Sequence, residues 1–359
     1  MSLYVISEQV GLDGYWITDI LCGIKNEADK KNLHIETFPS NIVIKEGNAP
    51  VVLVVGYSAE WTESVCRHVM RCGARPIAVN ACQNQAKGFA AAAVGFDYDG
   101  AVCRALAYLY SCGKRSVAFL GCRGNRMSFD CKKNAFEENS SRYSFENIGF
   151  FEAEGINEAV SDFLAEVSQF DAVICSRDVE AGAVGAKLQK KGINLSGRLY
   201  TVGFGDNAMA RYFTPSLTTL QTDFAALGSE AVRLSRHLLL SGCQGFVSSL
   251  LECPITVRES TEYSDGGTLD KQRPLAVPAY RSDAEYISYL QAEALVRSWD
   301  ALDRSIVACL VEGYNTAEIA EKLFVSPSSV KYRIKKMLTV ADLDGRSNLV
   351  SLVKKYSML

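Results

Sequence analysis

Short apolar runs, many of them β-branched, alternate with longer amphipathic stretches through residues 1–260 of this 359-residue chain. Val51–Val55 has the length and composition of a buried strand, and Glu60–Cys72 then repeats apolar residues at helical spacing. Strand-then-helix repetition favours doubly wound parallel sheets. The runs outnumber the strands that one twisted sheet usually carries, so we expect two lobes. The predicted strands are Tyr4–Ile6, His34–Phe38, Val51–Val55, Ile77–Val79, Ser116–Leu120, Ile148–Phe150, Ala172–Cys175 and Tyr200–Val202. The predicted helices are Tyr15–Lys31, Glu60–Cys72, Gly100–Ser111, Asn157–Val167 and Glu180–Lys191.

The tail from Leu302 to Tyr356 has a different pattern, with apolar residues at helical spacing in four short segments. Asn315 can cap the second segment, with Glu318 three residues later to complete a capping box. Ser326 can cap the third segment, and Pro327 suits its first turn. We therefore expect a small all-α unit of four helices. The residues expected in its core are Ile306, Leu310, Ile319, Ala320, Leu323, Val330, Ile334 and Leu338.

The third of these segments is strongly basic, because it holds four cations and no acidic residue lies between Glu321 and Asp342. Charge alone is weak evidence, since a Lys-rich helix is more often a solvated surface. A short, capped, cationic helix after a tight helix–turn–helix is nevertheless typical of a helix that enters the DNA major groove. The candidate contacts to double-stranded DNA are Ser328, Ser329, Lys331, Tyr332, Arg333, Lys335 and Lys336.

The tail resembles the LuxR/FixJ-type helix-turn-helix, whose pattern runs Leu-x-x-Arg, Gly-x-Ser-x-x-Glu-Ile-Ala and Ser-x-x-Thr-Val-Lys-x-His. The resemblance implies that Lys331, Tyr332 and Lys335 face the bases, while Ser328 and Ser329 suit phosphate oxygens. It also implies that the fourth segment pairs two modules in a homodimer. The matching or conservatively replaced positions are Leu302, Arg304, Gly313, Asn315, Glu318, Ile319, Ala320, Leu323, Ser326, Ser329, Val330 and Lys331. The residues expected to be exposed on the fourth segment are Leu349, Leu352 and Val353.

The composition is that of an ordinary globular chain, with 48% hydrophobic residues, 22% charged residues and a net charge of −3. Basic character is therefore local to the tail. The 12 cysteines are scattered, without a Cys-x-x-Cys pair, and we expect them to be reduced in a cytoplasmic protein. We expect neither a signal peptide nor a membrane span. The three histidines lie far apart and no nucleophile motif is present, so we expect no metal, no cofactor and no enzyme activity.

Residues 4–260 resemble the effector-binding domain of LacI/GalR-type regulators, which is similar to periplasmic sugar-binding proteins. The run GKRSVAFLG at 113–121 carries part of the resemblance, and residues 171–239 carry most of it. Val-Gly-Phe-x-Asp, Thr-Pro-x-Leu-Thr-Thr, Asp-Phe-x-x-Leu-Gly and a closing Val-Arg-Glu-Ser stand in family order. The resemblance implies two lobes joined by crossing strands with a small molecule between them. It also implies that the DNA-binding headpiece usual before this domain is absent, and that another DNA-binding module follows it.

The family's ligand positions map onto a changed set of residues in this chain. The aromatic contacts survive, but Lys132 replaces an arginine, Arg177 replaces an asparagine, and Gly205 replaces the first of two acids. Two cations suit an anionic effector such as a sugar acid, a phosphate or a carboxylate. The alternative is a degenerate site whose residues only pack or meet solvent. The candidate ligand-binding residues are Tyr15, Trp16, Lys132, Arg177, Asp206 and Thr222.

Between the two resemblances, residues 262–296 begin with a polar Gly- and Pro-containing stretch that indicates a linker. An amphipathic helix follows, which Ser282 or Asp283 could cap. We therefore predict an effector domain over 1–261, a linker and helix over 262–296, and a DNA-binding domain over 297–359.

The sequence thus predicts a DNA-binding transcription regulator that a sugar or an anionic metabolite controls. One alternative is a DNA-binding dimer with a vestigial, ligand-insensitive sensor. The other is a carbohydrate-binding component without a regulatory role, which the basic tail argues against.

Overall fold

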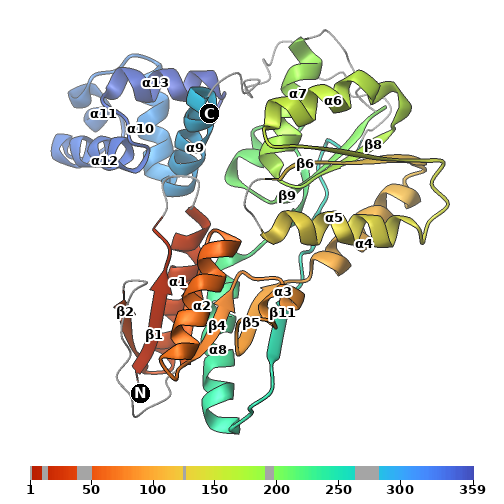
Figure 1. Cartoon of the computed structure of the whole chain (residues 1–359). Helices are drawn as coiled ribbons and strands as arrows, with labels where there is room; N and C mark the ends of the chain where they lie inside the picture. Colours follow the sequence, from red (N-terminus) through yellow and green to blue (C-terminus); the bar gives the residue numbers. More distant parts are fainter. Residues whose placement is uncertain (1, 10–14, 39–50, 124–126, 191–197, 263–282) are drawn as a thin grey trace.

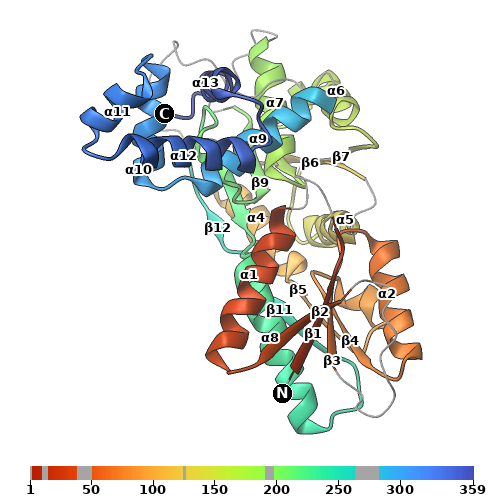
Figure 2. The same ribbon diagram turned by 90° about the vertical axis from the view of Figure 1, so that its left-hand side faces the viewer.

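The computed structural model divides the chain into two α/β lobes and a C-terminal helical unit (Figure 1). The helical unit lies beside the second lobe, and the N-terminus lies at the far end of the first lobe (Figures 1 and 2). In the part of the chain that the structure describes, no helix is both long and apolar enough to span a bilayer. The described residues are 2–9, 15–38, 51–123, 127–190, 198–262 and 283–359.

The first lobe is built on a six-stranded sheet in the order β11-β5-β4-β3-β1-β2, in which every neighbouring pair is parallel. Helices cover both of its faces, with α1 and α8 on one side and α2 on the other (Figure 2). Strands covered on both faces become continuous apolar runs, and all five residues of β3 are buried. The strands are β1 (Ser2–Ser7), β2 (His34–Phe38), β3 (Val51–Val55), β4 (Arg75–Val79), β5 (Ala92–Phe96) and β11 (Val247–Leu251). The helices are α1 (Tyr15–Lys30), α2 (Ala59–Arg71), α3 (Gln83–Ala86) and α8 (Phe224–Ser241).

The second lobe has a six-stranded sheet in the order β12-β10-β9-β8-β6-β7, parallel except where β12 pairs with β10. Helices α6 and α7 cover one face, and α4 and α5 cover the other (Figure 1). The prediction of two lobes with parallel sheets is confirmed. The strands are β6 (Ser116–Cys122), β7 (Asn147–Ala153), β8 (Ala172–Cys175), β9 (Tyr200–Gly205), β10 (Thr218–Gln221) and β12 (Ile255–Thr256). The helices are α4 (Tyr98–Ser111), α5 (Met127–Ser140), α6 (Ile156–Glu166) and α7 (Asp178–Lys190), with short 3₁₀ turns η2 (Val167–Gln169) and η3 (Ala208–Arg211).

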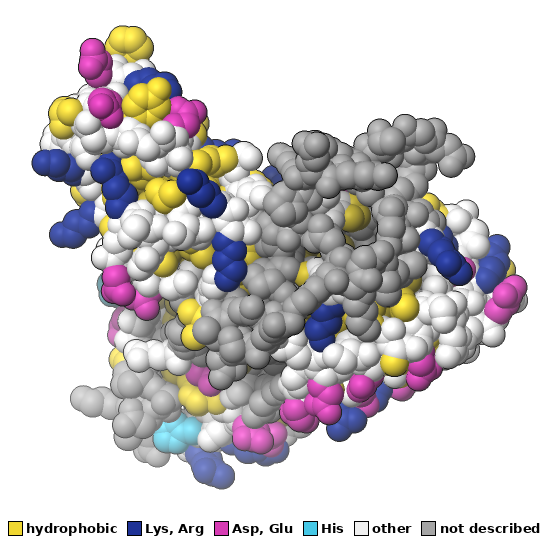
Figure 3. All heavy atoms as spheres, turned by 90° about the horizontal axis from the view of Figure 1, so that it is seen from above, with side chains coloured by type: hydrophobic (Ala, Val, Ile, Leu, Met, Phe, Trp, Pro, Cys, Tyr) yellow, Lys and Arg dark blue, Asp and Glu magenta, His cyan; other side chains and the backbone are white. Residues whose placement is uncertain are grey.

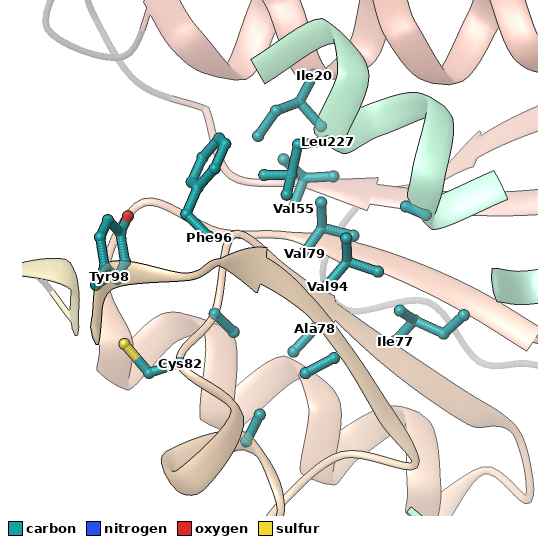
Figure 4. Packing of buried hydrophobic residues seen from close by; sticks show 14 of the residues in the cluster. Ile20, Val55, Ile77, Ala78, Val79, Cys82, Val94, Phe96, Tyr98 and Leu227 are labelled. Carbon is teal, nitrogen blue, oxygen red and sulfur yellow. The ribbon is translucent and has the colours of Figure 1, made fainter. Parts of the chain in front are cut away.

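The apolar core of the first lobe lies between its sheet and its helices, where Val55, Val79 and Val94 meet Ile20 and Leu227 (Figure 4). The sequence pattern does not predict β5, which supplies Val94, because its other residues are mostly alanine and glycine with low strand propensity. Strand β5 forms because tight packing favours small residues there.

Helices α1 and α8 approach so closely that glycine is required on both. A Cβ on Gly23 would lie 1.9 Å from the carbonyl oxygen of Ala225, and one on Gly228 would lie 2.0 Å from that of Ile20. The obstructing atoms belong to the backbone, so a change of side-chain rotamer cannot relieve either contact. The glycines therefore set the spacing of the helix pair that covers one face of the first sheet.

Gly228→Ala should lower the free energy of unfolding by about 1–3 kcal/mol, the usual range for overpacking, although alanine has the higher helix propensity. Urea unfolding followed by circular dichroism measures the change. Gly245→Ala is the matched control, because nothing lies within 4 Å of a Cβ built there. Equal midpoints for the two variants would contradict the close packing of α1 on α8.

Three chain segments join the lobes: the connections from β5 to α4, from β10 to α8, and from β11 to β12. They are tied to one another by backbone hydrogen bonds. The amide of Asp97 donates to the carbonyl of Leu251 at 2.8 Å, and the amide of Gln221 donates to that of Pro254 at 2.8 Å. Side-by-side crossings of this kind are the usual hinge of a two-lobed protein.

A disulfide joins the lobes at a second place, between Cys82 and Cys131, whose Cα atoms lie 6.8 Å apart. Cys82 precedes α3 in the first lobe, and Cys131 lies on α5 in the second. The expectation that all cysteines are reduced is therefore wrong for this pair. Sequence spacing did not reveal the pair because 49 residues separate the two cysteines, and only the packing of the lobes brings them together.

The helical unit contains five helices, and its helix ends follow the predicted signals. Asn315 and Glu318 form the predicted capping box, and the side chain of Ser326 accepts the amide of Ser329, with Pro327 at the start of the helix. A second capping box joins Asp300 and Asp303. The helices are α9 (Asp283–Ser298), α10 (Ala301–Val311), α11 (Thr316–Lys322), α12 (Pro327–Val340) and α13 (Arg346–Lys355).

The expected exposure of the apolar face of α13 is wrong. Leu349, Leu352 and Val353 are buried, because α9 and α10 pack against this face within the same chain. The ring of Tyr356 meets the ring of Tyr289 on α9 edge-on, with centroids 6.5 Å apart. Any pairing of two chains through the helical unit must therefore use another surface.

Helix α9 begins at Asp283, one of the two residues predicted to cap it, and the other, Ser282, lies outside the described residues. Its buried residues include Tyr289, Ala292 and Leu295, whereas Ile287 is 47% exposed. The helix packs against η3 of the second lobe on one side and against α12 and α13 on the other.

Candidate functional site

The outer face of α12 presents a row of exposed cations. Lys331, Lys335 and Lys336 are exposed, and Tyr332 between them is 70% exposed. Among the described residues, no ion pair or hydrogen bond uses these three ammonium groups. Dark blue side chains project from the helical unit at the left of Figure 3. This cationic face has the chemistry to meet a polyanion.

Arg333 lies on a different face of α12 from the exposed lysines. Its Nη1 donates to Asp300 at 2.7 Å and to Asp303 at 2.8 Å, at the start of α10. The hydrogen bond from Arg333 holds the pKa of the Asp300 carboxyl below its usual value. Arg333 thus fastens α12 to α10, and three lysines of the four predicted cations are left on the outer face.

The start of α12 is ordered by its own serines. Ser326 caps the helix, and its hydroxyl lies 2.9 Å from that of Ser328, which is exposed. Ser329 is half-buried. Ile319, Ala320, Val330 and Ile334 are buried between α11 and α12, together with the predicted Ile306 and Leu310 of α10. Leu323 and Leu338 are only half-buried.

A row of aromatic rings runs from the first lobe to the second at the interlobe junction, which we define by these rings and the polar residues beside them. Trp16 stacks on Tyr57 with centroids 5.9 Å apart and contacts Phe224 at 5.5 Å. Phe96 continues the row from Phe224, followed by Tyr98 and then Phe204 of the second lobe. Trp16, a predicted ligand contact, is therefore part of this row. The side chain of Tyr15 lies outside the described residues.

Lys132 is a buried cation at the second-lobe end of this row. Its Nζ donates to the carbonyl of Ser176 at 2.8 Å and lies 4.3 Å from the ring centroid of Phe204 and 5.1 Å from that of Tyr98. Only 6% of the residue is exposed. The attraction between an ammonium and aromatic faces offsets part of the cost of burying this side chain.

The other predicted polar contacts are tied to neighbours. Arg177 donates from Nε and Nη2 to Glu180 at 3.0 and 2.9 Å. Asp206 accepts from Arg258, and the hydroxyl of Thr222 donates to the carbonyl of Gly205 at 3.3 Å. A buried carboxylate thus balances Arg177, one of the two cations expected to bind an anion.

Asp178 is a buried acid at this junction that sequence reasoning did not place in the site. It accepts hydrogen bonds from the hydroxyl of Thr219 and, at 2.7 Å, from the amide of Asn207. Burial raises its pKa to about 7 despite these bonds. Its position next to Arg177, directly after a buried strand, was the signal that could have identified it.

Helix α9 contacts both lobes and packs against α12 and α13 within the helical unit. The carboxylate of Glu293, 1% exposed, accepts the amides of Ala208 and Met209 in the second lobe, each at 2.9 Å. Arg297, one turn further on, pairs with Asp19 on α1 of the first lobe. The helix therefore gives the first lobe a direct ionic contact with the chain that leads to α12 (Figure 2).

Known proteins share the fold of the two lobes. Residues 106–261 match the family model described as a periplasmic binding protein-like domain. The two-sheet fold is that of the lac repressor: a structure of that repressor bound to ONPG in the repressed state superposes with a TM-score of 0.59 at 16% identity, covering 72% of this chain and 81% of the other. The complex of the regulator CelR with cellobiose gives a TM-score of 0.60 at 15% identity, covering 72% of this chain and 84% of the other.

Individual relatives match over a shorter stretch. The transcriptional regulator GalR of Escherichia coli K12 is 33% identical over 85 residues, which is 23% of this chain and 24% of GalR. The transcriptional repressor PurR of Pasteurella multocida is 34% identical over 87 residues, which is 24% of this chain and 26% of PurR. The matches thus span about a quarter of the length of these curated relatives. Both are named as helix-turn-helix regulators.

Raising the pH from 4 to 7 should destabilise the fold through Asp178. Its carboxyl keeps its proton in the folded state up to about pH 7, whereas the unfolded chain releases it near the usual pKa of 3.8. The folded state then binds more protons across this window, so the free energy of unfolding falls as the pH rises. Asp178→Asn should flatten this part of the profile of urea midpoint against pH. The exposed Asp162→Asn is the control and should leave the slope unchanged.

Proposed function

We propose that this protein is a DNA-binding transcription regulator in which α12 enters the major groove of duplex DNA. The exposed cationic face of α12 carries the proposal. Lys331 and Lys335 lie one turn apart on it, with Tyr332 beside them, so their side chains can reach base edges or phosphates together. The tight α11–α12 pair, with its capped second helix, fits a LuxR-type helix-turn-helix. The regulators among the relatives support the same class of function.

The two-lobed part is proposed to bind a small polar effector at the interlobe junction. The aromatic row offers ring faces to the apolar side of a sugar, and Lys132 offers a charge to an acid group. The solved relatives with the same fold include complexes with cellobiose and lactose. A neutral sugar and an anionic sugar-like metabolite are both compatible with this chemistry.

Helix α9 is the proposed route from effector to DNA. Glu293 fixes it to the second lobe, while Arg297 reaches Asp19 on the first. A change in the angle between the lobes alters the Arg297–Asp19 contact, because the two residues belong to different sides of the hinge. In a homodimer, such a shift would change the spacing of the two α12 helices and with it the affinity for paired half-sites.

A ligand-insensitive DNA-binding dimer is the second candidate function. Two observations favour it: Arg177 is balanced by Glu180, and Asp206 is balanced by Arg258. Residues that satisfy one another have less to offer a ligand. An effector screen on the full chain distinguishes the two candidates.

Removing Lys331 and Lys335 together should weaken binding to a selected duplex, by about 1–3 kcal/mol for each lysine that contacts a base. If instead both lysines contact phosphates, the slope of log K against the logarithm of the salt concentration should become shallower by roughly two. Fluorescence anisotropy titrations at several salt concentrations measure both quantities. Lys354→Ala, an exposed lysine of α13, is the matched control. Wild-type affinity in the double variant would show that α12 is not the DNA-contacting helix.

An effector should raise the melting temperature of the full chain and change its DNA affinity. At a hundred times its Kd, a ligand that binds only the folded state adds about 2.7 kcal/mol of stability. The screen uses neutral disaccharides, sugar acids and sugar phosphates, with differential scanning fluorimetry as the measurement. In Arg297→Ala the thermal shift should persist while the change in DNA affinity is lost. No shift with any compound, together with intact DNA binding, would favour the ligand-insensitive alternative.

A further inference from the structure

The Cys82–Cys131 disulfide is the one covalent link between the lobes, apart from the three backbone crossings, in the part of the chain that is described. Cys82 lies after the carboxyl end of β4, at the edge of the first sheet that faces the second lobe. Cys131 lies in the first half of α5, next to Lys132 of the interlobe junction. The bond therefore sits beside the junction and near the β5–α4 crossing, because Lys132 lies over the ring of Tyr98.

The bond is compatible with only one range of lobe separations. Disulfides join Cα atoms about 4.4–6.8 Å apart, and a pair more than about 7 Å apart cannot be bridged without backbone movement. Cys82 and Cys131 are 6.8 Å apart, which is at the upper end of that range. A rotation about the hinge that moves α3 away from α5 would increase the Cα–Cα distance beyond what a disulfide can span. The oxidised pair thus excludes an opened arrangement of the lobes.

We infer that Cys82 and Cys131 form a redox latch: oxidation fixes the lobes together, and reduction lets them separate. The cysteine pair is thus a site of oxidative modification that controls movement of the lobes. This inference does not depend on the proposed binding of DNA. The effect of the latch is on the interlobe junction, because a latched protein cannot widen the space around Lys132 and the aromatic row.

A low-molecular-weight disulfide such as oxidised glutathione supplies the chemistry. The half-buried Cys131 is the more accessible thiol, since Cys82 is 9% exposed. The Cys131 thiolate attacks one glutathione sulfur, which forms a mixed disulfide and releases one glutathione thiolate. The Cys82 thiolate then attacks Cys131 Sγ and releases the second glutathione. Two protein thiols are oxidised, one glutathione disulfide is reduced, and the two protons pass to the two glutathione molecules.

Several of the other cysteines are less reactive toward the oxidant than this pair, or are exposed and can serve as a comparison. Burial raises the pKa of the Cys66, Cys122 and Cys253 thiols to about 12, so little thiolate forms at neutral pH. Cys22 and Cys112 are exposed and free, and they provide an internal comparison for the oxidant.

The test uses the full-length protein, reduced and then equilibrated in buffers of increasing ratio of oxidised to reduced glutathione. Free thiols are alkylated, the protein is digested under non-reducing conditions, and mass spectrometry of the peptides identifies which cysteines are paired. We expect the Cys82–Cys131 peptide pair to accumulate while Cys22 and Cys112 carry glutathione or remain free. Failure of this pair to form at any ratio would overturn the inference.

Hydrogen–deuterium exchange measures the effect of the bond on the lobes without DNA or effector. Amides of the three crossing segments and of α3 should exchange several-fold more slowly in the oxidised protein than in the reduced one. This difference should be lost in both Cys82→Ser and Cys131→Ser and retained in Cys112→Ser. Equal exchange in the oxidised and reduced wild-type protein, with the bond shown to be present, would overturn the latch whether or not the variants fold.

Discussion

The buried carboxylate of Glu293 joins the helical unit to the rest of the protein. A carboxylate that is 1% exposed is costly to desolvate, and burial raises its pKa, yet two backbone amides of the second lobe hydrogen-bond to it. The same helix packs Tyr289 against α13 and places Arg297 beside the first lobe. The orientation of α12 relative to both lobes depends on this contact, because α9 touches both lobes and also packs against α12.

The interlobe junction combines mobility with constraint. Three crossings with paired backbone hydrogen bonds permit rotation, whereas the Cys82–Cys131 bond restricts it. The polar groups around the aromatic row are largely satisfied by one another: Arg177 by Glu180, and Asp206 by Arg258. Lys132 donates to the carbonyl of Ser176 and lies over the rings of Phe204 and Tyr98. The junction therefore joins a row of rings to polar groups that are held by their neighbours.

Much of the local structure could be predicted from sequence because its causes are local. The capping box of Asn315 and Glu318 depends on residues three apart, and the buried strand Val51–Val55 depends on an uninterrupted apolar run. Strand β5 was missed because its small residues are favoured by close packing and not by strand propensity. The candidate site was only partly predictable: the lysines of α12 follow from composition, but the diversion of Arg333 to Asp300 and Asp303 requires the fold.

The sequence by itself determined the alternation that builds two parallel sheets, the helix ends of the tail and the concentration of cations on α12. Each of these is encoded by neighbours along the chain, through periodicity, capping and local charge. Only the tertiary structure decided that Cys82 meets Cys131, that α9 covers the apolar face of α13, and that Asp178 is buried with a raised pKa. Those outcomes depend on which surfaces come together across long separations in the chain, and burial and pairing are properties of that contact and not of the residues alone.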